Sequence, residues 1–381
     1  MKENWTYKKL TDVCDIQYGY PFDSACFSTS PDEGMPLIRI RDVKDGCTST
    51  YYKGDYPKEY IIHKGDYLVG MDGEFNIAPW KSEDALLNQR VCKVASKSED
   101  VCIGFLYRFL IKELKKIEEE TPFVTVKHLS AKRLNQVFLD IPSLPEQKRI
   151  VSELDLLQSI IDKQQAQLKE LDKLAQAVFY DMFGDPVENE KGWEVKTMGE
   201  VGELQRGSGL SKKDLIEDGF PCMLYGQIHT RFGGYTKKHV ACIPKELVKT
   251  AKIAHPGDVI MAITSEDVEG SCKSVAWMGD YDIAIGSDAA IYRHAMNGIY
   301  VSYYTQTKAF FNEKAKYAKG FKVTHISTKE ISIIPIPFPP LSLQHSFATK
   351  IESIEKQKAA ISQSIAETQK LFDYTMDKYF G

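Results

Sequence analysis

The chain carries the segment Ile141-Pro-Ser-Leu-Pro-Glu-Gln-Lys-Arg-Ile150 twice, the second time as Phe338-Pro-Pro-Leu-Ser-Leu-Gln-His-Ser-Phe347, 197 residues further on. The same offset relates other residues, among them His128 with His325, Trp80 with Trp277, and the two Phe-Gly pairs at 183–184 and 380–381. Near the two starts the offset falls to 188, where Trp5 and Gly19 match Trp193 and Gly207. Self-similarity of this kind indicates an internal duplication, in which each half has an irregular region followed by one long segment.

The long segment of each half has the pattern of a helix. Its apolar residues alternate steps of four and three, which is a heptad a/d seam. The first seam consists of Ile150, Leu154, Leu157, Ile161, Gln164, Leu168, Leu171, Ala175, Val178 and Met182. The second consists of Phe347, Ile351, Ile354, Lys358, Ile361, Ile365, Thr368, Phe372, Thr375 and Tyr379. No Gly or Pro interrupts residues 146–183, and a helix of that length spans roughly 57 Å.

A narrow apolar seam on so long a helix must be covered, and the second copy is the nearest cover. We therefore expect the two helices to pair, running antiparallel with the globular regions at opposite ends. A homodimeric coiled coil is the alternative. The duplication argues against it, because the chain already carries a second helix of the same pattern.

The globular regions have the pattern of mixed α/β domains with short strands. Pro36-Leu-Ile-Arg-Ile-Arg41 alternates apolar and basic residues, which predicts a half-buried strand with Arg39 and Arg41 on one face. A Gly-Asp turn precedes an apolar strand at residues 64–69 and again at 256–261, and buried helices are expected over 101–110 and 299–304. The expected fold class is thus α+β, with domains over residues 1–143 and 185–340 and spacer helices over 144–184 and 341–381.

Composition and missing motifs limit the chemistry. The 49 basic and 53 acidic residues give a net charge of −4, no run is long and apolar enough for a membrane span, and the eight cysteines show no metal-ligating or disulfide spacing. There is no phosphate-binding loop, HExxH or GxSxG motif, and the single GxG at Gly207-Ser-Gly209 lacks the third glycine. We expect a cytoplasmic protein with no catalytic residues, no metal and no membrane partner.

The whole chain resembles the specificity subunits of type I restriction-modification systems. The resemblance is carried by the proline-rich start of each long helix, by the tandem half-repeat, and by Gly65-Asp66, Gly70-Met-Asp-Gly-Glu-Phe75 and Leu87-Asn-Gln-Arg-Val91. The second copy departs from the pattern, since Leu341-Ser-Leu-Gln344-His-Ser keeps the glutamine but loses the Glu and the Lys-Arg pair.

The resemblance implies that each globular region is a target-recognition domain for one half of a bipartite DNA sequence. It implies that the helix pair sets the gap between the two half-sites and docks two methyltransferase subunits for adenine N6 methylation. A restriction or translocase subunit is a further possible partner. It also implies no cofactor in this chain, with S-adenosylmethionine in the partner methyltransferase subunit. The alternative is a coiled-coil scaffold that joins partners without reading DNA.

Candidate DNA-binding residues follow from this interpretation. Arginine pairs with guanine, and glutamine or asparagine pairs with adenine, while lysines contact phosphates. Neither domain is basic on average, so we expect weak DNA binding by the chain alone. The candidates are Arg39, Arg41, Lys44, Lys127, His128, Gln227, His229, Arg231, Lys237, Lys238, Lys319 and Lys322.

Overall fold

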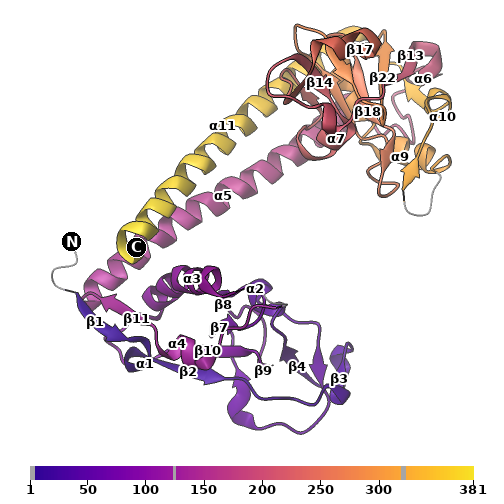
Figure 1. Ribbon diagram of the computed structural model, residues 1–381. Helices are drawn as coiled ribbons and strands as arrows, with labels where there is room; N and C mark the ends of the chain where they lie inside the picture. The colour runs from indigo at the N-terminus through magenta and orange to yellow at the C-terminus, as the bar shows by residue number, and fades with distance from the viewer. Residues whose placement is uncertain (1–4, 123–125, 319–322) are drawn as a thin grey trace. The chain divides into compact units, whose positions relative to one another are not determined.

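The computed structural model describes residues 5–122, 126–318 and 323–381 (Figure 1). The chain divides into two compact units, Met1–Gln164 with Ser364–Gly381, and Gln165–Gln363. Each unit contains one globular domain and part of both long helices. Among the described residues, no helix is long and apolar enough to cross a membrane.

The first unit combines three sheets with short helices. A four-stranded sheet has the order β2-β10-β7-β8, a five-stranded sheet has the order β3-β5-β4-β9-β6, and β1 pairs with β11. Its strands are β1 (Thr6–Lys9), β2 (Cys14–Tyr18), β3 (Phe27–Ser28), β4 (Met35–Ile38), β5 (Tyr51–Tyr52), β6 (Ile61–Ile62), β7 (Tyr67–Gly70), β8 (Ile77–Pro79), β9 (Ala85–Leu87), β10 (Val91–Ser96) and β11 (Phe138–Ile141). Its helices are α1 (Leu10–Val13), α2 (Asp42–Asp45), α3 (Ile103–Glu120) and α4 (Ala131–Asn135).

The second unit repeats this plan with small additions. The sheets have the orders β13-β22-β18-β20-β15 and β16-β14-β21-β17, and the pairs are β12-β24 and β19-β23. Its strands are β12 (Val195–Thr197), β13 (Gly202–Arg206), β14 (Phe220–Met223), β15 (Tyr235–Thr236), β16 (Ala241–Ile243), β17 (Lys252–Ala254), β18 (Val259–Ala262), β19 (Thr264–Ser265), β20 (Ser274–Trp277), β21 (Ile283–Ile285), β22 (Ala289–His294), β23 (Thr324–His325) and β24 (Pro335–Pro337). Its helices are α6 (Met198–Val201), α7 (Tyr225–Thr230), α8 (Gly298–Tyr304), α9 (Lys308–Ala315) and α10 (Thr328–Ser332).

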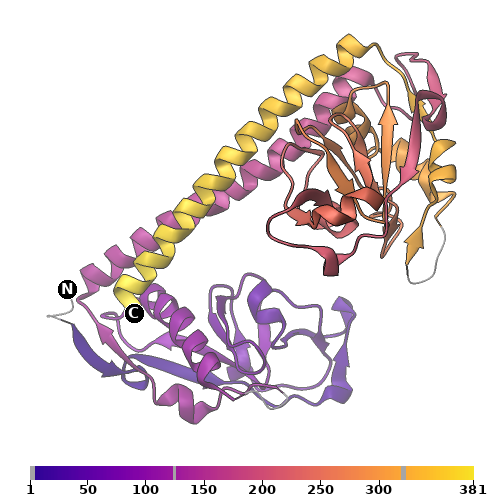
Figure 2. The same ribbon diagram turned by 45° about the horizontal axis from the view of Figure 1, so that its top comes forward.

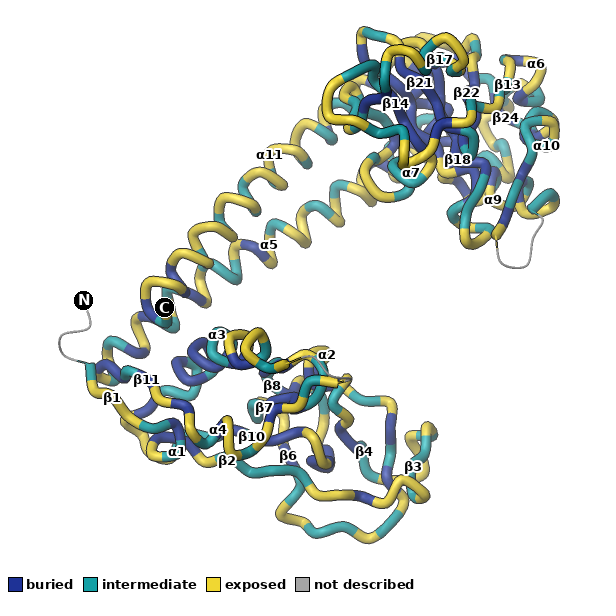
Figure 3. Tube along the Cα trace, viewed as in Figure 1, coloured by how far each residue is buried: buried dark blue, intermediate teal, exposed yellow. Residues whose placement is uncertain are grey.

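The expected duplication of mixed α/β domains is confirmed, and the contacts that hold each domain together repeat with it. Trp80 and Trp277 are buried, and their indole N–H groups donate to the carbonyls of Glu83 and Tyr281 at 2.6 and 2.7 Å. Figure 3 shows buried stretches of the chain gathered around β14, β18 and β21.

A matched pair of glycines has a steric explanation. A Cβ on Gly19 would lie 2.0 Å from the carbonyl oxygen of Asn88, and one on Gly207 would lie 2.1 Å from that of Gly286. Real side chains do not approach backbone so closely. These glycines therefore allow the chain after β2 and after β13 to pass against the turns that follow β9 and β21.

The long helices are α5 (Leu144–Phe183) and α11 (Leu341–Phe380), each of 40 residues. They lie side by side in Figures 1 and 2. In the first unit the start of α5 contacts the end of α11, because Arg149 donates to the Tyr379 hydroxyl at 2.8 Å. In the second unit Lys358 of α11 pairs with Asp172 of α5 at 2.7 Å. These contacts confirm the expected antiparallel pair.

The seam is buried unevenly along the helices. Ile150, Leu154 and Ile161 are at most 2% exposed, and Phe347, Ile351 and Ile354 at most 5%, whereas Leu157, Leu168, Leu171, Ile361 and Ile365 are partly exposed. Five of these buried residues belong to a domain core, Ile150 and Leu154 to the first and Phe347, Ile351 and Ile354 to the second, where the globular domain adds a further layer over the helix pair. Ile161 is the exception, because it is buried without being part of either core. Figure 3 shows this change along α5 and α11.

The end of α5 corrects the heptad assignment. The buried residues there are Ala175, Phe179 and Phe183, at most 3% exposed, while the predicted Val178 and Met182 are only partly buried. Phe179 and Phe183 pack on Phe347 and on Tyr300 of α8. The domain core, through Tyr300, and the partner helix, through Phe347, together decide which face is buried at this end.

A buried glutamine fixes the start of each long helix to its own domain. Gln147 and Gln344 are fully buried. The Gln147 amide nitrogen donates to the carbonyls of Pro142 and Asp100, and its oxygen accepts from the backbone N–H of Cys102, the residue before α3. Gln344 likewise donates to the Pro339 carbonyl at 2.7 Å and accepts from the N–H of Asn297, the residue before α8, at 2.8 Å.

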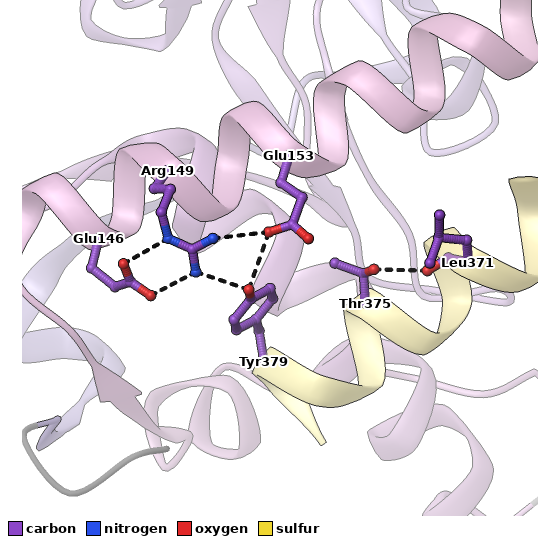
Figure 4. A network of polar contacts seen from close by, with 6 residues as sticks. All are labelled: Glu146, Arg149, Glu153, Leu371, Thr375 and Tyr379. Atoms are coloured by element: carbon purple, nitrogen blue, oxygen red, sulfur yellow. Dashed lines mark hydrogen bonds and ion pairs between the residues drawn. The ribbon is translucent and has the colours of Figure 1, made fainter.

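The rest of the helix start differs between the copies. In the first, Arg149 donates to Glu146, Glu153 and the Tyr379 hydroxyl, and Tyr379 donates to Glu153 (Figure 4). The hydrogen bonds from Arg149 lower the pKa of Glu146. In the second copy Ser346 takes the position of Arg149, and the next residue, Phe347, packs against aromatic rings. The loss of Lys-Arg therefore removes this polar network but leaves the glutamine contacts in place.

We predict that Gln147→Ala lowers the free energy of unfolding by about 2–4 kcal/mol, because it leaves a buried N–H and two buried carbonyls without partners. Gln344→Ala should have a similar effect. Urea unfolding followed by circular dichroism measures the change, with Gln167→Ala as control, since Gln167 is an exposed residue of the same helix as Gln147. Equal stability of Gln147→Ala and Gln167→Ala would contradict the prediction.

Candidate functional site

In each domain, loops that follow several strands meet at one edge. In the first domain β4 and β9 are parallel, with Leu37 opposite Leu86 and Ile38 opposite Leu87, so both chains leave the sheet at the same side. The end of β7 joins them, because the Met71 N–H donates to the Arg90 carbonyl at 2.9 Å. We call the residues at this edge the first strand-end site: 39–46, 71–76, 88–90 and 126–130.

The second domain builds the same edge. Met223 of β14 lies opposite Ile285 of the parallel strand β21, and the Ile263 N–H donates to the Asp288 carbonyl at 3.0 Å. The second strand-end site consists of residues 224–231, 263–273, 286–288 and 323–327. Carboxyl ends of neighbouring parallel strands are a common place for ligands to bind in open α/β sheets.

The loop after β4 corrects the interpretation of Arg39 and Arg41. The strand ends at Ile38, and Arg41 directly precedes α2. The carboxylate of Asp42 accepts from the Arg39 N–H and from the Thr48 hydroxyl, both at 2.8 Å. This turn ends the alternation that the sequence suggested, so the two arginines do not share a strand face.

The second domain makes the equivalent turn with a different residue. The side-chain oxygen of Gln227 accepts from the Leu224 N–H at 2.9 Å, as Asp42 does from Arg39. The candidate Gln227 is therefore partly engaged in holding α7. Lys44 and His229 also take equivalent places: Lys44 lies 3.4 Å from Glu74 in the loop after β7, and His229 contacts the carbonyl of Thr264 in β19, which follows β18.

The first strand-end site contains a charged cluster. Asp72 Oδ1 lies 2.5 Å from Nδ1 of His128, and Asp72 Oδ2 lies 3.5 Å from Nε of Arg90. Nη1 of Arg90 lies 3.2 Å from His128 Nδ1. The candidate Lys127 points elsewhere, because its Nζ donates to the Glu118 carbonyl at 2.6 Å and is largely buried.

The second site is less charged at the corresponding place. His325 lies 3.2 Å from the Thr264 hydroxyl, and Lys273 donates to the His229 carbonyl at 3.0 Å. Other residues of the second site, among them Gln227, Arg231 and Asp288, line a cleft of about 840 Å³.

The remaining candidates lie apart from these sites or outside the described residues. Lys237 forms an ion pair with Glu352 of α11 at 2.9 Å, and Lys238 is exposed beside it. Lys319 and Lys322 lie outside the described residues. Sequence reasoning missed Arg90, Asp72 and Asp288; the signal that was present, Leu87-Asn-Gln-Arg-Val91, gave no indication of their spatial neighbours.

Several cysteine thiols of the two domains are buried. Burial raises the pKa of Cys14, Cys92, Cys222 and Cys272 to about 12, so these thiols remain protonated at neutral pH. Within the described part of the chain, no group of three His, Cys, Asp or Glu side chains is placed to hold a metal ion. The strand-end sites instead present exposed hydrogen-bonding side chains on fixed turns, which suits recognition.

Comparison with known proteins gives a consistent result. A family model described as the type I restriction modification DNA specificity domain matches residues 2–173 and again 190–369. The EcoBI specificity subunit of Escherichia coli is 42% identical over 172 residues, which cover 45% of this chain and 36% of that subunit. The MjaVIII specificity subunit of Methanocaldococcus jannaschii is 23% identical over 379 residues, 93% of this chain and 86% of that subunit.

Solved structures share the fold. The S subunit of a type I restriction-modification system from M. genitalium aligns with a TM-score of 0.57 at 14% identity, over 99% of this chain and 96% of that one. A chain from a study of type I complex assembly and conformational transition aligns equally well, at 18% identity over 99% of this chain and 98% of that one.

We predict that Asp42→Ala destabilises the first domain by about 1–3 kcal/mol, because two part-buried hydrogen bonds to one carboxylate are lost. Asp42→Asn, which keeps an acceptor oxygen, should lose less. Thermal unfolding compares both with Asp45→Ala, an exposed acid of the same helix. The prediction fails if Asp42→Ala is no less stable than Asp45→Ala.

Proposed function

We propose, because the chain belongs to the type I restriction-modification DNA specificity family, that each globular domain reads one half of a bipartite DNA target through its strand-end site. The observation that carries the proposal is that one backbone frame occurs twice with different side chains on it. Two half-sites of different sequence demand this combination, since the duplex geometry is common to both and the base edges are not.

The two strand-end sites share their backbone arrangement, which we call the frame, whereas the side chains on this frame differ. The parallel strand pair, the turn behind it and the hydrogen bond from the end of β7 or β18 occur in both domains. On that frame the first domain carries Lys44 and Arg90 where the second carries His229 and Asp288. Side chains of such different hydrogen-bonding character at matched positions favour DNA recognition over a purely structural role.

Two arginines add to this surface. Arg39 and Arg231 are exposed, and neither guanidinium has a hydrogen bond or ion pair to another described residue. Both are available to phosphates or bases. The domains remain close to neutral, with 20 basic against 22 acidic residues over 1–145 and 19 of each over 185–340, so we infer that partner subunits supply much of the phosphate contact.

We infer that catalysis belongs to those partners. In this proposal two methyltransferase subunits hold S-adenosylmethionine and methylate adenine N6, a restriction subunit joins where cleavage occurs, and this chain contributes recognition alone. The duplication supports two copies of one partner, because a repeated surface offers the same contact twice.

The long helices carry a suitable repeated feature. Leu174 of α5 and Leu371 of α11 occupy equivalent positions, and 47% and 52% of their surfaces are exposed. Both lie outside the seam. Tyr374, 67% exposed, lies beside Leu371 on α11. We propose that each leucine forms part of the docking surface for one methyltransferase subunit.

The decisive experiment is mapping of N6-methyladenine across the source genome with the gene intact and deleted. We expect deletion to remove one bipartite motif, two short half-sites around a fixed gap. An unchanged methylome, with the partner methyltransferase shown to be expressed, would overturn recognition and favour the scaffold.

A second experiment tests docking. Leu371→Gln should weaken one methyltransferase contact by about 10- to 100-fold, the effect of exposing a buried leucine, and Leu174→Gln with Leu371→Gln should weaken both. Native mass spectrometry counts the bound subunits. Val187→Gln, which removes a similarly exposed apolar side chain away from the helices, is the control, and two retained subunits in the double variant would refute this surface.

A further inference from the structure

The turn between β9 and β10 and the turn between β21 and β22 can be compared residue by residue. Both contain three residues, Asn88-Gln-Arg90 and Gly286-Ser-Asp288. The last residue of each accepts the N–H that follows the neighbouring strand, from Met71 at 2.9 Å and from Ile263 at 3.0 Å. Arg90 and Asp288 therefore occupy the same point of the frame.

Arg90 holds this place in a strained conformation. Its backbone angle φ is +70°, in the left-handed region that residues other than glycine, asparagine and aspartate rarely adopt. Asp288 is not among the described residues of positive φ, although it accepts the same hydrogen bond. The shared backbone contact thus does not demand a positive φ, and the conformation of Arg90 places its side chain beside Asp72 and His128.

Neighbouring residues orient the Arg90 side chain but do not bind all of its hydrogen-bond donors. Asp72 lies 3.5 Å from Nε, and the two ring nitrogens of His128 lie 3.2 and 3.4 Å from Nη1. Within the described chain, Nη2 has no hydrogen-bond partner. The side chain remains 54% exposed. A guanidinium fixed from one side, with donors left on the other, is prepared for a bidentate acceptor.

The matched position in the second domain indicates which acceptor. Asp288 presents a carboxylate there, 41% exposed and 3.7 Å from Arg206. Phosphates are anionic in both half-sites, and a carboxylate does not bind them. Base edges do change between half-sites: arginine matches the O6 and N7 acceptors of guanine, and a carboxylate matches the amino group of cytosine.

We propose that Arg90 reads a guanine in the major groove of one half-site, with Asp72 and His128 as the positioning residues that aim its guanidinium. The inference rests on the proposed function and names one base contact within it. It assigns the first domain a half-site that contains guanine, and makes position 90 with its counterpart 288 a determinant of specificity.

The test uses the assembled methyltransferase complex and its mapped target. Each guanine of the target is replaced in turn by 7-deazaguanine, which keeps base pairing and removes the N7 acceptor. In the wild type, one replacement in one half-site should weaken binding by about 5- to 150-fold. With Arg90→Gln, binding of the intact target should fall by a similar factor, and that replacement should then have no further effect.

A second variant separates recognition from misfolding. Glycine adopts a positive φ without strain, so Arg90→Gly should fold at least as well as the wild type by thermal unfolding while losing the same guanine dependence. Arg133→Gln is the matched control, since Arg133 is 51% exposed and ion-paired with Glu120 in the same domain. It should keep the wild-type dependence on every guanine.

Two results would overturn the inference while leaving the proposed function intact. In the first, both Arg90 variants keep the full dependence on every guanine. In the second, they weaken binding uniformly for all sequences, which is the behaviour of a phosphate contact. A wild-type complex with no sequence preference would instead refute the proposed function itself.

Discussion

The architecture depends on one buried amide repeated twice. Gln147 and Gln344 each join three backbone segments: the proline-rich turn before a long helix, the helix itself, and the residue that precedes a helix in the globular domain. Because an amide side chain both donates and accepts, a single residue satisfies backbone groups on both sides of that junction. Neighbouring residues were free to diverge, and they did so into an ionic network at one end and an aromatic cluster at the other.

Much of the fold was predictable from the sequence because its cues are local or periodic. The offset of 197 residues revealed the duplication, and the steps of four and three revealed the helices. The sequence pattern gave a wrong prediction where a residue or element outside the pattern determined the local structure. Residues 36–41 alternate like a strand, but the carboxylate of Asp42 captures the Arg39 N–H and ends it. The last turns of α5 bury Phe179 and Phe183 because the domain core covers a face that the heptad did not mark.

The candidate site was less predictable, for a reason of distance along the chain. Residue type identified several basic side chains as candidates, yet the residues that contact each of them lie far away in the sequence. Asp72, Arg90 and His128 are separated by 18 and 38 residues, and they meet because β7 and β9 end at one edge and the segment with His128 pairs there with Asp72. Conversely, Lys127 looked available in the sequence and is occupied by the Glu118 carbonyl.

The equal length of the two three-residue turns has an evolutionary consequence. A substitution at Arg90 or Asp288 leaves the backbone hydrogen bond of the turn in place, because each residue contributes its carbonyl to that bond and not its side chain. Mutation is then able to alter what one half recognises while the other half stays as it was. In a duplicated gene with such turns, a single codon change can alter the recognition residue of one domain. The two domains can therefore change their recognition residues independently, and each intermediate sequence still folds.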